Sequence, residues 1–139
     1  MEMNSRRPQF WILLAGISGF IGVAAGAFGA HALKSRLDAE MLAVFETAVR
    51  YQMYHTFALL GVAYLAARRA SRAVTMAGIC FGAGILVFSG SLYILALSGQ
   101  RIWGAVTPFG GVALLAGWLL VAVQGLYPPP LSPATESRS

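Results

Sequence analysis

Charged residues are scarce in this chain. Of its 139 residues, 11% are Asp, Glu, Lys or Arg, whereas soluble domains contain about 25%. Such a chain cannot build the surface of an ordinary water-soluble protein. The net charge of +5 is modest, and the basic residues stand at the ends of hydrophobic runs. This placement is typical of residues that meet lipid headgroups, and it argues against a nucleic-acid-binding protein.

The sequence also lacks the motifs of common enzymes. It contains no HExxH, CxxC, P-loop or GxSxG pattern, and its two histidines and few carboxylates do not have the spacing of a metal site. The single cysteine, Cys80, cannot form an intramolecular disulfide, and we expect an inert, buried thiol. We therefore expect no catalytic residues, no cofactor and no metal, in a protein that is not an enzyme.

Four long hydrophobic segments make up most of the chain. Segments free of Asp, Glu, Lys and Arg run over residues 8–33, 51–67, 73–100 and 102–135. A helix needs about 20 hydrophobic residues to cross a bilayer. The second segment alone is shorter, but Asp38 suits an N-cap ahead of it, so its helix starts earlier and is long enough. The sequence predicts an all-α, integral-membrane, four-helix transmembrane bundle in one domain, residues 1–127. Its helices should span about residues 9–32, 38–67, 73–98 and 102–127.

The two ends of the chain carry signals of their own. The first hydrophobic segment follows Arg6 and Arg7, as in a secretory signal peptide, but it is longer than the hydrophobic part of such a peptide. We therefore expect a retained helix. The last helix should end at Tyr127, because PPPLSP follows it. Residues 128–139 are rich in Pro and Ser, and they are predicted to form a disordered tail.

The basic residues of the connections predict the orientation of the helices. Lys and Arg are enriched in cytoplasmic loops of membrane proteins. The side of the termini holds Arg6, Arg7, Arg68, Arg69, Arg72 and Arg138, against Lys34, Arg36 and Arg101 on the other side. We expect a bacterial inner-membrane protein with both termini in the cytoplasm.

Glycine is abundant, at 16 residues, and small residues let membrane helices approach closely. In the first helix Ala15, Gly19, Gly22, Gly26 and Gly29 follow a 4,3,4,3 spacing and share one stripe. The third helix has a shorter ridge at Gly78 and Gly82. These ridges could contact a second copy of the chain or pack within one bundle, and we favour packing within the bundle.

Most ionisable residues inside the hydrophobic part gather in FETAVRYQMYH, residues 45–55. A helical wheel puts Glu46, Arg50, Tyr54, Thr47, Tyr51 and His55 on one half of the second helix, with Gln52 as an exception. Glu46 and Arg50 have the i,i+4 spacing of an ion pair. A charge facing lipid at the bilayer centre costs about 2.5–3.5 kcal/mol. We therefore predict that this polar face looks into the bundle.

The alternating directions of the helices bring other polar residues to the same half of the membrane. The candidate polar cluster consists of His31, Glu46, Arg50, Tyr51, His55, Ser91 and Tyr93. An ionisable residue inside a membrane suggests a functional site, but we favour a cluster that only fastens the helices together. A proton relay would require hydrogen bonds that link His55 to Tyr93 or Glu46.

Four strings carry a resemblance to a known family: GAFGAHALKSRL, FETAVRYQMYHTFALL, FSGSLYILALSG and TPFGGVALLAGWLL. Together they resemble the YgdD/YwdK family of small bacterial inner-membrane proteins, a domain of unknown function with distant eukaryotic relatives. The match runs from about Gly16 to Leu120 and uses all four predicted helices in order. The resemblance implies a four-helix inner-membrane protein, and it carries no catalytic or ligand residues to this chain.

Two functions fit these observations. The first is a non-enzymatic structural or accessory membrane component, whose partners are the lipid bilayer and either a second copy or another membrane protein. The second is a small transporter, or a module that binds a small molecule or a proton through the polar cluster. A single four-helix chain without an inverted repeat is small for alternating access, so transport would require an oligomer. We favour the first function.

Overall fold

The computed structural model describes residues 6–69 and 71–127, and within them the chain is helical apart from short connections. The predicted tail, residues 128–139, lies outside the described residues. The elements in order are α1 (Arg6–Phe28), η2 (Gly29–Leu33), α2 (Ala39–Arg68), α3 (Arg72–Gly84), η3 (Ile85–Ser89), α4 (Gly90–Ser98) and α5 (Ile102–Gly125). The two η elements are π-helical turns that continue a neighbouring α-helix. The predicted second and fourth helices correspond to α2 and α5.

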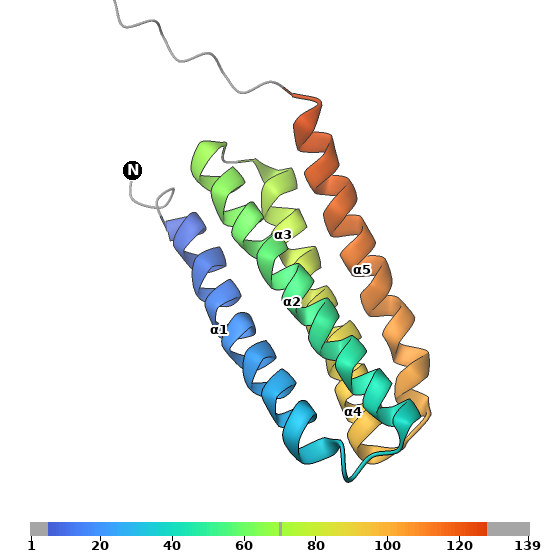
Figure 1. Ribbon diagram of the computed structural model, residues 1–139. Coiled ribbons are helices and arrows are strands. Elements are labelled where there is room, and N and C mark those ends of the chain that lie inside the picture. Colours follow the sequence, from blue (N-terminus) through green and yellow to red (C-terminus); the bar gives the residue numbers. More distant parts are fainter. Residues whose placement is uncertain (1–5, 70, 128–139) are drawn as a thin grey trace, which may run out of the picture.

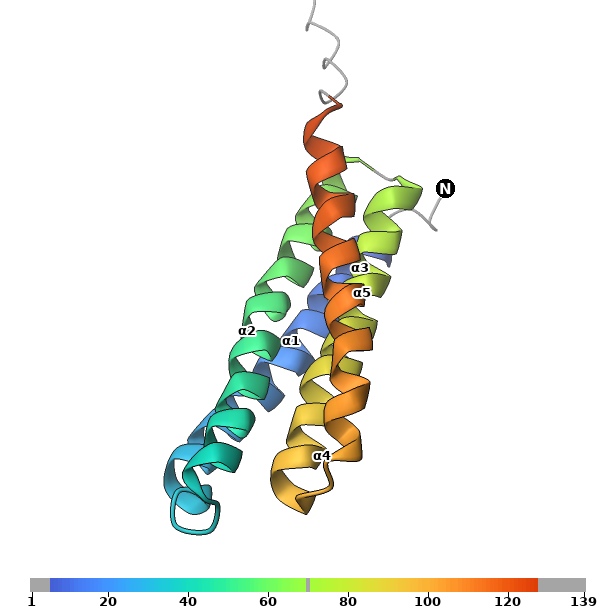
Figure 2. The ribbon, with the colours of Figure 1, turned by 90° about the vertical axis from the view of Figure 1, so that its right-hand side faces the viewer.

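The elements form four antiparallel rods, because η2 extends α1, and α3, η3 and α4 run on as a single rod (Figures 1 and 2). α1 packs mainly against α2, and α5 packs mainly against α3, η3 and α4. α2 joins the two pairs, because it contacts α1 on one side and α3, η3 and α4 on another. The start of α1, the α2–α3 connection and the end of α5 lie at one end of the bundle.

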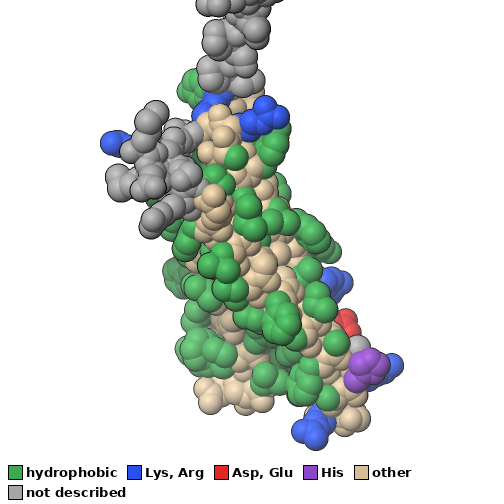
Figure 3. All heavy atoms as spheres, turned by 90° about the vertical axis from the view of Figure 1, so that its left-hand side faces the viewer, with side chains coloured by type: hydrophobic (Ala, Val, Ile, Leu, Met, Phe, Trp, Pro, Cys, Tyr) green, Lys and Arg blue, Asp and Glu red, His purple; other side chains and the backbone are tan. Residues whose placement is uncertain are grey.

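Three rods are long and hydrophobic enough to cross a membrane by length and composition: Pro8–Leu33, Arg72–Ser98 and Ile102–Gly125. The fourth rod, α2, has 30 residues, which also exceeds the length that a bilayer core requires. Large hydrophobic side chains cover much of the outer surface, and charged side chains gather toward its ends (Figure 3). The predicted all-α transmembrane bundle is confirmed.

Local hydrogen bonds explain where two helices start and one stops. The side chain of Asp38 accepts a hydrogen bond from Met41 N at 2.8 Å, and Ser71 accepts one from Val74 N at 3.1 Å. Both are N-caps, which satisfy donors that a first helical turn leaves unpaired. α4 ends at Gly99, whose φ of +69° belongs to the left-handed region that favours glycine.

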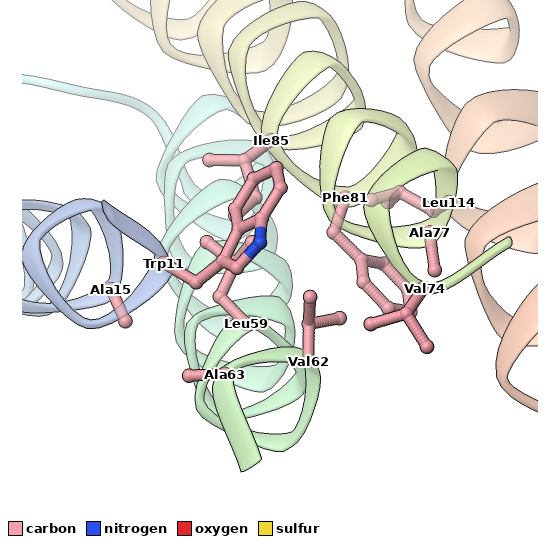
Figure 4. Packing of buried hydrophobic residues seen from close by; sticks show 10 residues of the cluster. All are labelled: Trp11, Ala15, Leu59, Val62, Ala63, Val74, Ala77, Phe81, Ile85 and Leu114. Carbon is pink, nitrogen blue, oxygen red and sulfur yellow. The ribbon is translucent and has the colours of Figure 1, made fainter. Parts of the chain in front are cut away.

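The core lies where α1, α2, α3 and α5 meet. Figure 4 shows its side chains converging from these helices, with Trp11 of α1 beside Leu59 of α2. Phe81 of α3 and Leu114 of α5 complete the far side. In a bilayer such packing, rather than expulsion from water, holds helices together.

Glycines bring the rods close together. In the first stripe, an added Cβ would lie 2.6 Å from Met53 at Gly22, 3.3 Å from Val49 at Gly26 and 2.8 Å from Phe45 at Gly29. At Gly19 it would lie 3.4 Å from Thr56. All four neighbours belong to α2 of the same chain, so this stripe packs within the bundle. Gly78 and Gly82 of α3 face Trp11 and Leu14 of α1 in the same way.

The third rod contains an irregularity that the sequence does not predict. The π-helical turn η3 interrupts it between Gly84 and Gly90. At this level α5 comes so near that a Cβ on Gly110 would overlap the backbone of Phe88. The contact between η3 and α5 is therefore made by backbone as well as side chains.

Candidate functional site

The inward face of α2 is a stripe of buried residues with helical spacing: Phe45, Ala48, Gln52, His55, Thr56, Leu59, Val62 and Ala63. Three of these residues are polar, and they occupy consecutive turns in the middle of the helix. Gln52 and Thr56 bond toward α1 and α4, while His55 bonds toward α5. The polar part of the bundle interior therefore divides into two groups.

The first group is a hydrogen-bonded network around Gln52, which we call the Gln52 network: Ser18, Gln52, Thr56 and Tyr93. The amide Nε2 of Gln52 donates to Ser18 O at 2.9 Å, and its Oε1 accepts from the Tyr93 hydroxyl at 2.8 Å. The Thr56 hydroxyl donates to Gln52 O at 2.8 Å and lies 2.7 Å from Ser18 Oγ. Because Thr56 has already used its proton, Ser18 is the donor in that pair. The network links α1, α2 and α4 without any charged group.

The second group is centred on His55, which is 6% exposed. The Trp118 indole Nε1 donates to His55 Nε2 at 3.2 Å, and His55 Nδ1 lies 2.7 Å from Tyr51 O. An indole N–H can only donate, and a carbonyl can only accept. Nε2 therefore carries the lone pair and Nδ1 carries the proton, so the ring is neutral with both nitrogens engaged.

Aromatic rings surround the imidazole. Tyr51 stacks on Phe88 with ring centroids 4.6 Å apart, and Phe81 meets Trp118 edge to face at 5.2 Å. The His55 ring lies 5.8 Å from Phe81 and 6.2 Å from Trp118. Edge-to-face and offset arrangements of this kind are the favoured geometries of aromatic pairs.

Of these rings, Tyr51, Phe88 and Trp118 line a groove between α2 and α5 with a volume of about 670 Å³. Its lining residues are Tyr51, Tyr54, His55, Phe88, Pro108, Gly111, Val112, Leu114, Leu115 and Trp118. Tyr54, Val112 and Leu115 are more than half exposed, so the groove opens onto the outer surface of the bundle. It is mostly hydrophobic, with one imidazole at its base.

Two further buried serines, Ser89 and Ser91, lie at the η3 turn and at the start of α4. The Ser91 hydroxyl of α4 lies 2.8 Å from the Thr107 hydroxyl of α5 and joins these two helices. Ser89 is 2% exposed, and its hydroxyl has no hydrogen-bond partner among the described residues. Ser91 therefore fastens two rods, whereas Ser89 is buried without a hydrogen bond to any described residue.

The structure does not bring the predicted cluster together, and the predicted inward orientation of its charged face is wrong. Glu46 and Arg50 are exposed, and in the described part of the chain no ion pair joins them. Arg50 instead reaches Thr47 Oγ1 at 3.4 Å. His31 is exposed as well, on the π-helical turn η2.

The physical reason lies in the packing of α1. Its glycine stripe seats Phe45, Val49, Met53 and Thr56, so the inward face of α2 is centred on Gln52 rather than on Glu46. Of the other predicted residues, His55 bonds to the Tyr51 carbonyl, Ser91 to Thr107, and Tyr93 to Gln52. His55 and Tyr93 thus belong to different groups, and no described hydrogen bond links His55 to Tyr93 or Glu46.

Sequence reasoning missed Ser18, Gln52, Thr56, Thr107 and Trp118. A usable signal was present for Gln52 and Thr56. The hydrophobic positions Phe45, Ala48, Leu59 and Val62 continue through residues 52, 55 and 56 at helical spacing. Gln52 falls among hydrophobic residues on the wheel, and that position is the reason why it is buried.

Comparisons with known proteins agree with this architecture. The family model described as "Protein of unknown function (DUF423)" matches residues 25–111. The UPF0382 inner membrane protein YgdD of Escherichia coli (strain K12) is 47% identical over 118 residues, which cover 85% of this chain and 90% of that protein. The UPF0382 membrane protein YwdK of Bacillus subtilis (strain 168) is 44% identical over 119 residues, covering 85% and 97% of the two chains.

A third relative comes from another genus. The UPF0382 membrane protein SSP2132 of Staphylococcus saprophyticus is 44% identical over 115 residues, which cover 83% of this chain and 95% of that protein. No solved structure matches the chain. The relatives span nearly the same length as the described helices, and their names assign a membrane location without an activity.

Proposed function

This chain belongs to the DUF423 family of membrane proteins of unknown function, and we propose that it is a non-enzymatic structural or accessory component of the bacterial inner membrane. The observation that carries the proposal is the Gln52 network. Its side chains bond to one another and to backbone within the chain, so they fasten α1, α2 and α4 instead of facing a substrate. Interhelical hydrogen bonds of this type stabilise membrane bundles.

The outer surface supports a role that depends on contact within the membrane. Phe20 of α1 is 78% exposed, Phe57 of α2 is 64% exposed and Phe109 of α5 is 75% exposed. These three faces are suited to lipid, to a second copy of the chain or to another membrane protein. Figure 3 looks at the side of α1 and shows hydrophobic side chains over much of that face.

Site-specific photo-crosslinking in living cells tests the accessory role. A photoreactive phenylalanine analogue replaces Phe20, Phe57 or Phe109 in turn, because an aromatic ring already stands at each position. We expect at least one face to form a discrete protein adduct, with buried Phe81 as the unreactive control. Adducts with lipid alone on all three faces would overturn the accessory role.

We further propose that both termini lie in the cytoplasm. The end of the bundle where α1 begins and α5 ends also holds Arg68, Arg69 and Arg72, and Arg69 donates to Tyr127 O at 2.7 Å across that end. Lys34, Arg36 and Arg101 lie at the opposite end. This distribution follows the enrichment of basic residues on the cytoplasmic side.

Reporter fusions at the C-terminus check this orientation. A green fluorescent protein fused after residue 139 should fluoresce, because it folds in the cytoplasm, and alkaline phosphatase at the same position should be inactive. The same phosphatase inserted after Lys34 should be active. The reverse pattern would show that the bundle is inverted.

The groove at His55 favours a second candidate, a module that binds a small hydrophobic molecule or a proton. The groove offers about 670 Å³ beside a neutral imidazole and several aromatic rings. Mass spectrometry of the protein purified from native membranes in mild detergent separates the two candidates. A stoichiometric small molecule that is lost in His55→Phe, with thermal stability unchanged, would favour the binding module over the accessory role.

A further inference from the structure

The outer seam between α1 and α2 carries two opposite charges that the bundle itself does not use. Glu46 and Arg50 are exposed, one helical turn apart, and no described ion pair joins them. Together with Gly26, Gly29, Phe45 and Val49, they line a cavity of about 210 Å³. The floor is apolar, because Phe45 and Val49 pack directly on the two glycines. A carboxylate and a guanidinium therefore flank a hydrophobic depression on the outer surface of a membrane protein.

The length of α2 indicates the depth of these charges. The hydrocarbon core of a bilayer takes about 20 helical residues. Counted back from Arg68, the charged last residue of α2, this length begins at Val49. Glu46 therefore lies about 4 Å outside the boundary between headgroups and acyl chains, and Arg50 lies just inside it.

The Arg50 side chain points back toward that boundary. Its guanidinium reaches Thr47 Oγ1, one turn nearer the start of α2. Arginine side chains near helix ends extend in this way toward the headgroup region. Arg50 thus presents a cation at phosphate depth, with the Glu46 carboxylate on the side nearer the water.

We propose that this seam binds a zwitterionic phospholipid with a primary amine, of the phosphatidylethanolamine class. In such a lipid the phosphate is attached next to the acyl chains, and the ammonium group lies beyond it toward the water. The depth order of Arg50 and Glu46 matches that order. Arginine binds phosphate through several parallel N–H donors, and Glu46 accepts hydrogen bonds from the ammonium group.

The same chemistry predicts selectivity among lipids. A choline headgroup has no N–H to donate to Glu46, and a glycerol headgroup places a neutral group beside that carboxylate. An anionic lipid drawn only by net charge would instead prefer the basic residues at this end, Lys34, Arg36 and Arg101. This proposal goes beyond the accessory role, and it applies in either orientation of the bundle.

Native mass spectrometry of the detergent-purified protein, titrated with lipids of identical acyl chains, tests the site. The wild type should bind phosphatidylethanolamine about tenfold more tightly than phosphatidylcholine or phosphatidylglycerol, as expected for one charge-assisted hydrogen bond. Arg50→Gln should weaken binding of the ethanolamine lipid by about tenfold. Glu46→Gln should abolish the preference for ethanolamine over choline. Arg101→Gln, an exposed arginine at the same end of the bundle, should change neither result.

A charge-swapped double variant, Glu46→Arg with Arg50→Glu, keeps both charges and reverses their depth. It should lose the preference for the ethanolamine lipid while far-UV circular dichroism remains that of the wild type. Equal binding of the three lipids by the wild type would overturn the proposal. So would tighter binding of phosphatidylglycerol, or a loss in Arg101→Gln as large as that in Arg50→Gln.

Discussion

Replacing Gly110 with alanine is expected to destabilise the bundle by ~1–3 kcal/mol, the usual cost of overpacking a well-packed interior. The added methyl group would overlap the backbone of Phe88 in η3. A backbone cannot move aside as a flexible side chain can, so α5 must shift away from the third rod. Unfolding by sodium dodecyl sulfate in mixed micelles, followed by circular dichroism, measures the change in free energy.

Gly61→Ala is the matched control for this substitution. Gly61 also lies inside a helix, but a Cβ there has no heavy atom within 4 Å. Alanine is the better helix former, so this variant should be as stable as the wild type or slightly more stable. Equal destabilisation by both substitutions would show that η3 and α5 do not approach as closely as the structure describes.

Replacing Gln52 with leucine is expected to cost about 1–3 kcal/mol of stability. Leucine has a similar volume, but it removes the bond to Ser18 O and the bond from Tyr93 at once. Interhelical hydrogen bonds in membrane proteins contribute about 0.6 kcal/mol on average and up to about 1.7 kcal/mol. The loss is larger here because the Tyr93 hydroxyl remains half-buried without its partner. The same detergent unfolding assay applies.

Glu46→Gln is the comparison that separates the two accounts of the polar residues. Glu46 is exposed and has no ion pair with Arg50 in the described structure, so in lipid-free detergent this variant should unfold like the wild type. If Glu46→Gln lost as much stability as Gln52→Leu, the charged pair would be the fastener, and the role assigned to the Gln52 network would be wrong.

The fold could be predicted from the sequence because bilayer thickness imposes long hydrophobic segments. The first helix extends to Leu33, and the second begins after the predicted N-cap Asp38. The η3 turn could not be predicted. Its residues, Ile85 to Ser89, have the composition of an ordinary membrane helix, and the close approach to α5 at this level appears only where Gly110 meets Phe88.

The candidate site could be predicted only in part, because a helical wheel gives relative angles and not the direction of the bundle. The wheel grouped His55 with Glu46 and Arg50, which are polar but exposed. The direction is set by tertiary contacts, chiefly the glycine stripe of α1 that receives Phe45 and Met53. The hydrogen bond between His55 and Trp118, residues far apart in the sequence, carries no local signal at all.

A double-mutant cycle on Gln52 and Tyr93 tests most directly whether the Gln52 network fastens the bundle. The free energies of unfolding of Gln52→Leu, Tyr93→Phe and the double variant are compared with that of the wild type. A hydrogen bond between the two side chains predicts a coupling of about 0.6–1.7 kcal/mol, so the double variant should lose less than the sum of the single losses. Strictly additive losses would contradict the account, because they would mean that Gln52 and Tyr93 stabilise the bundle independently.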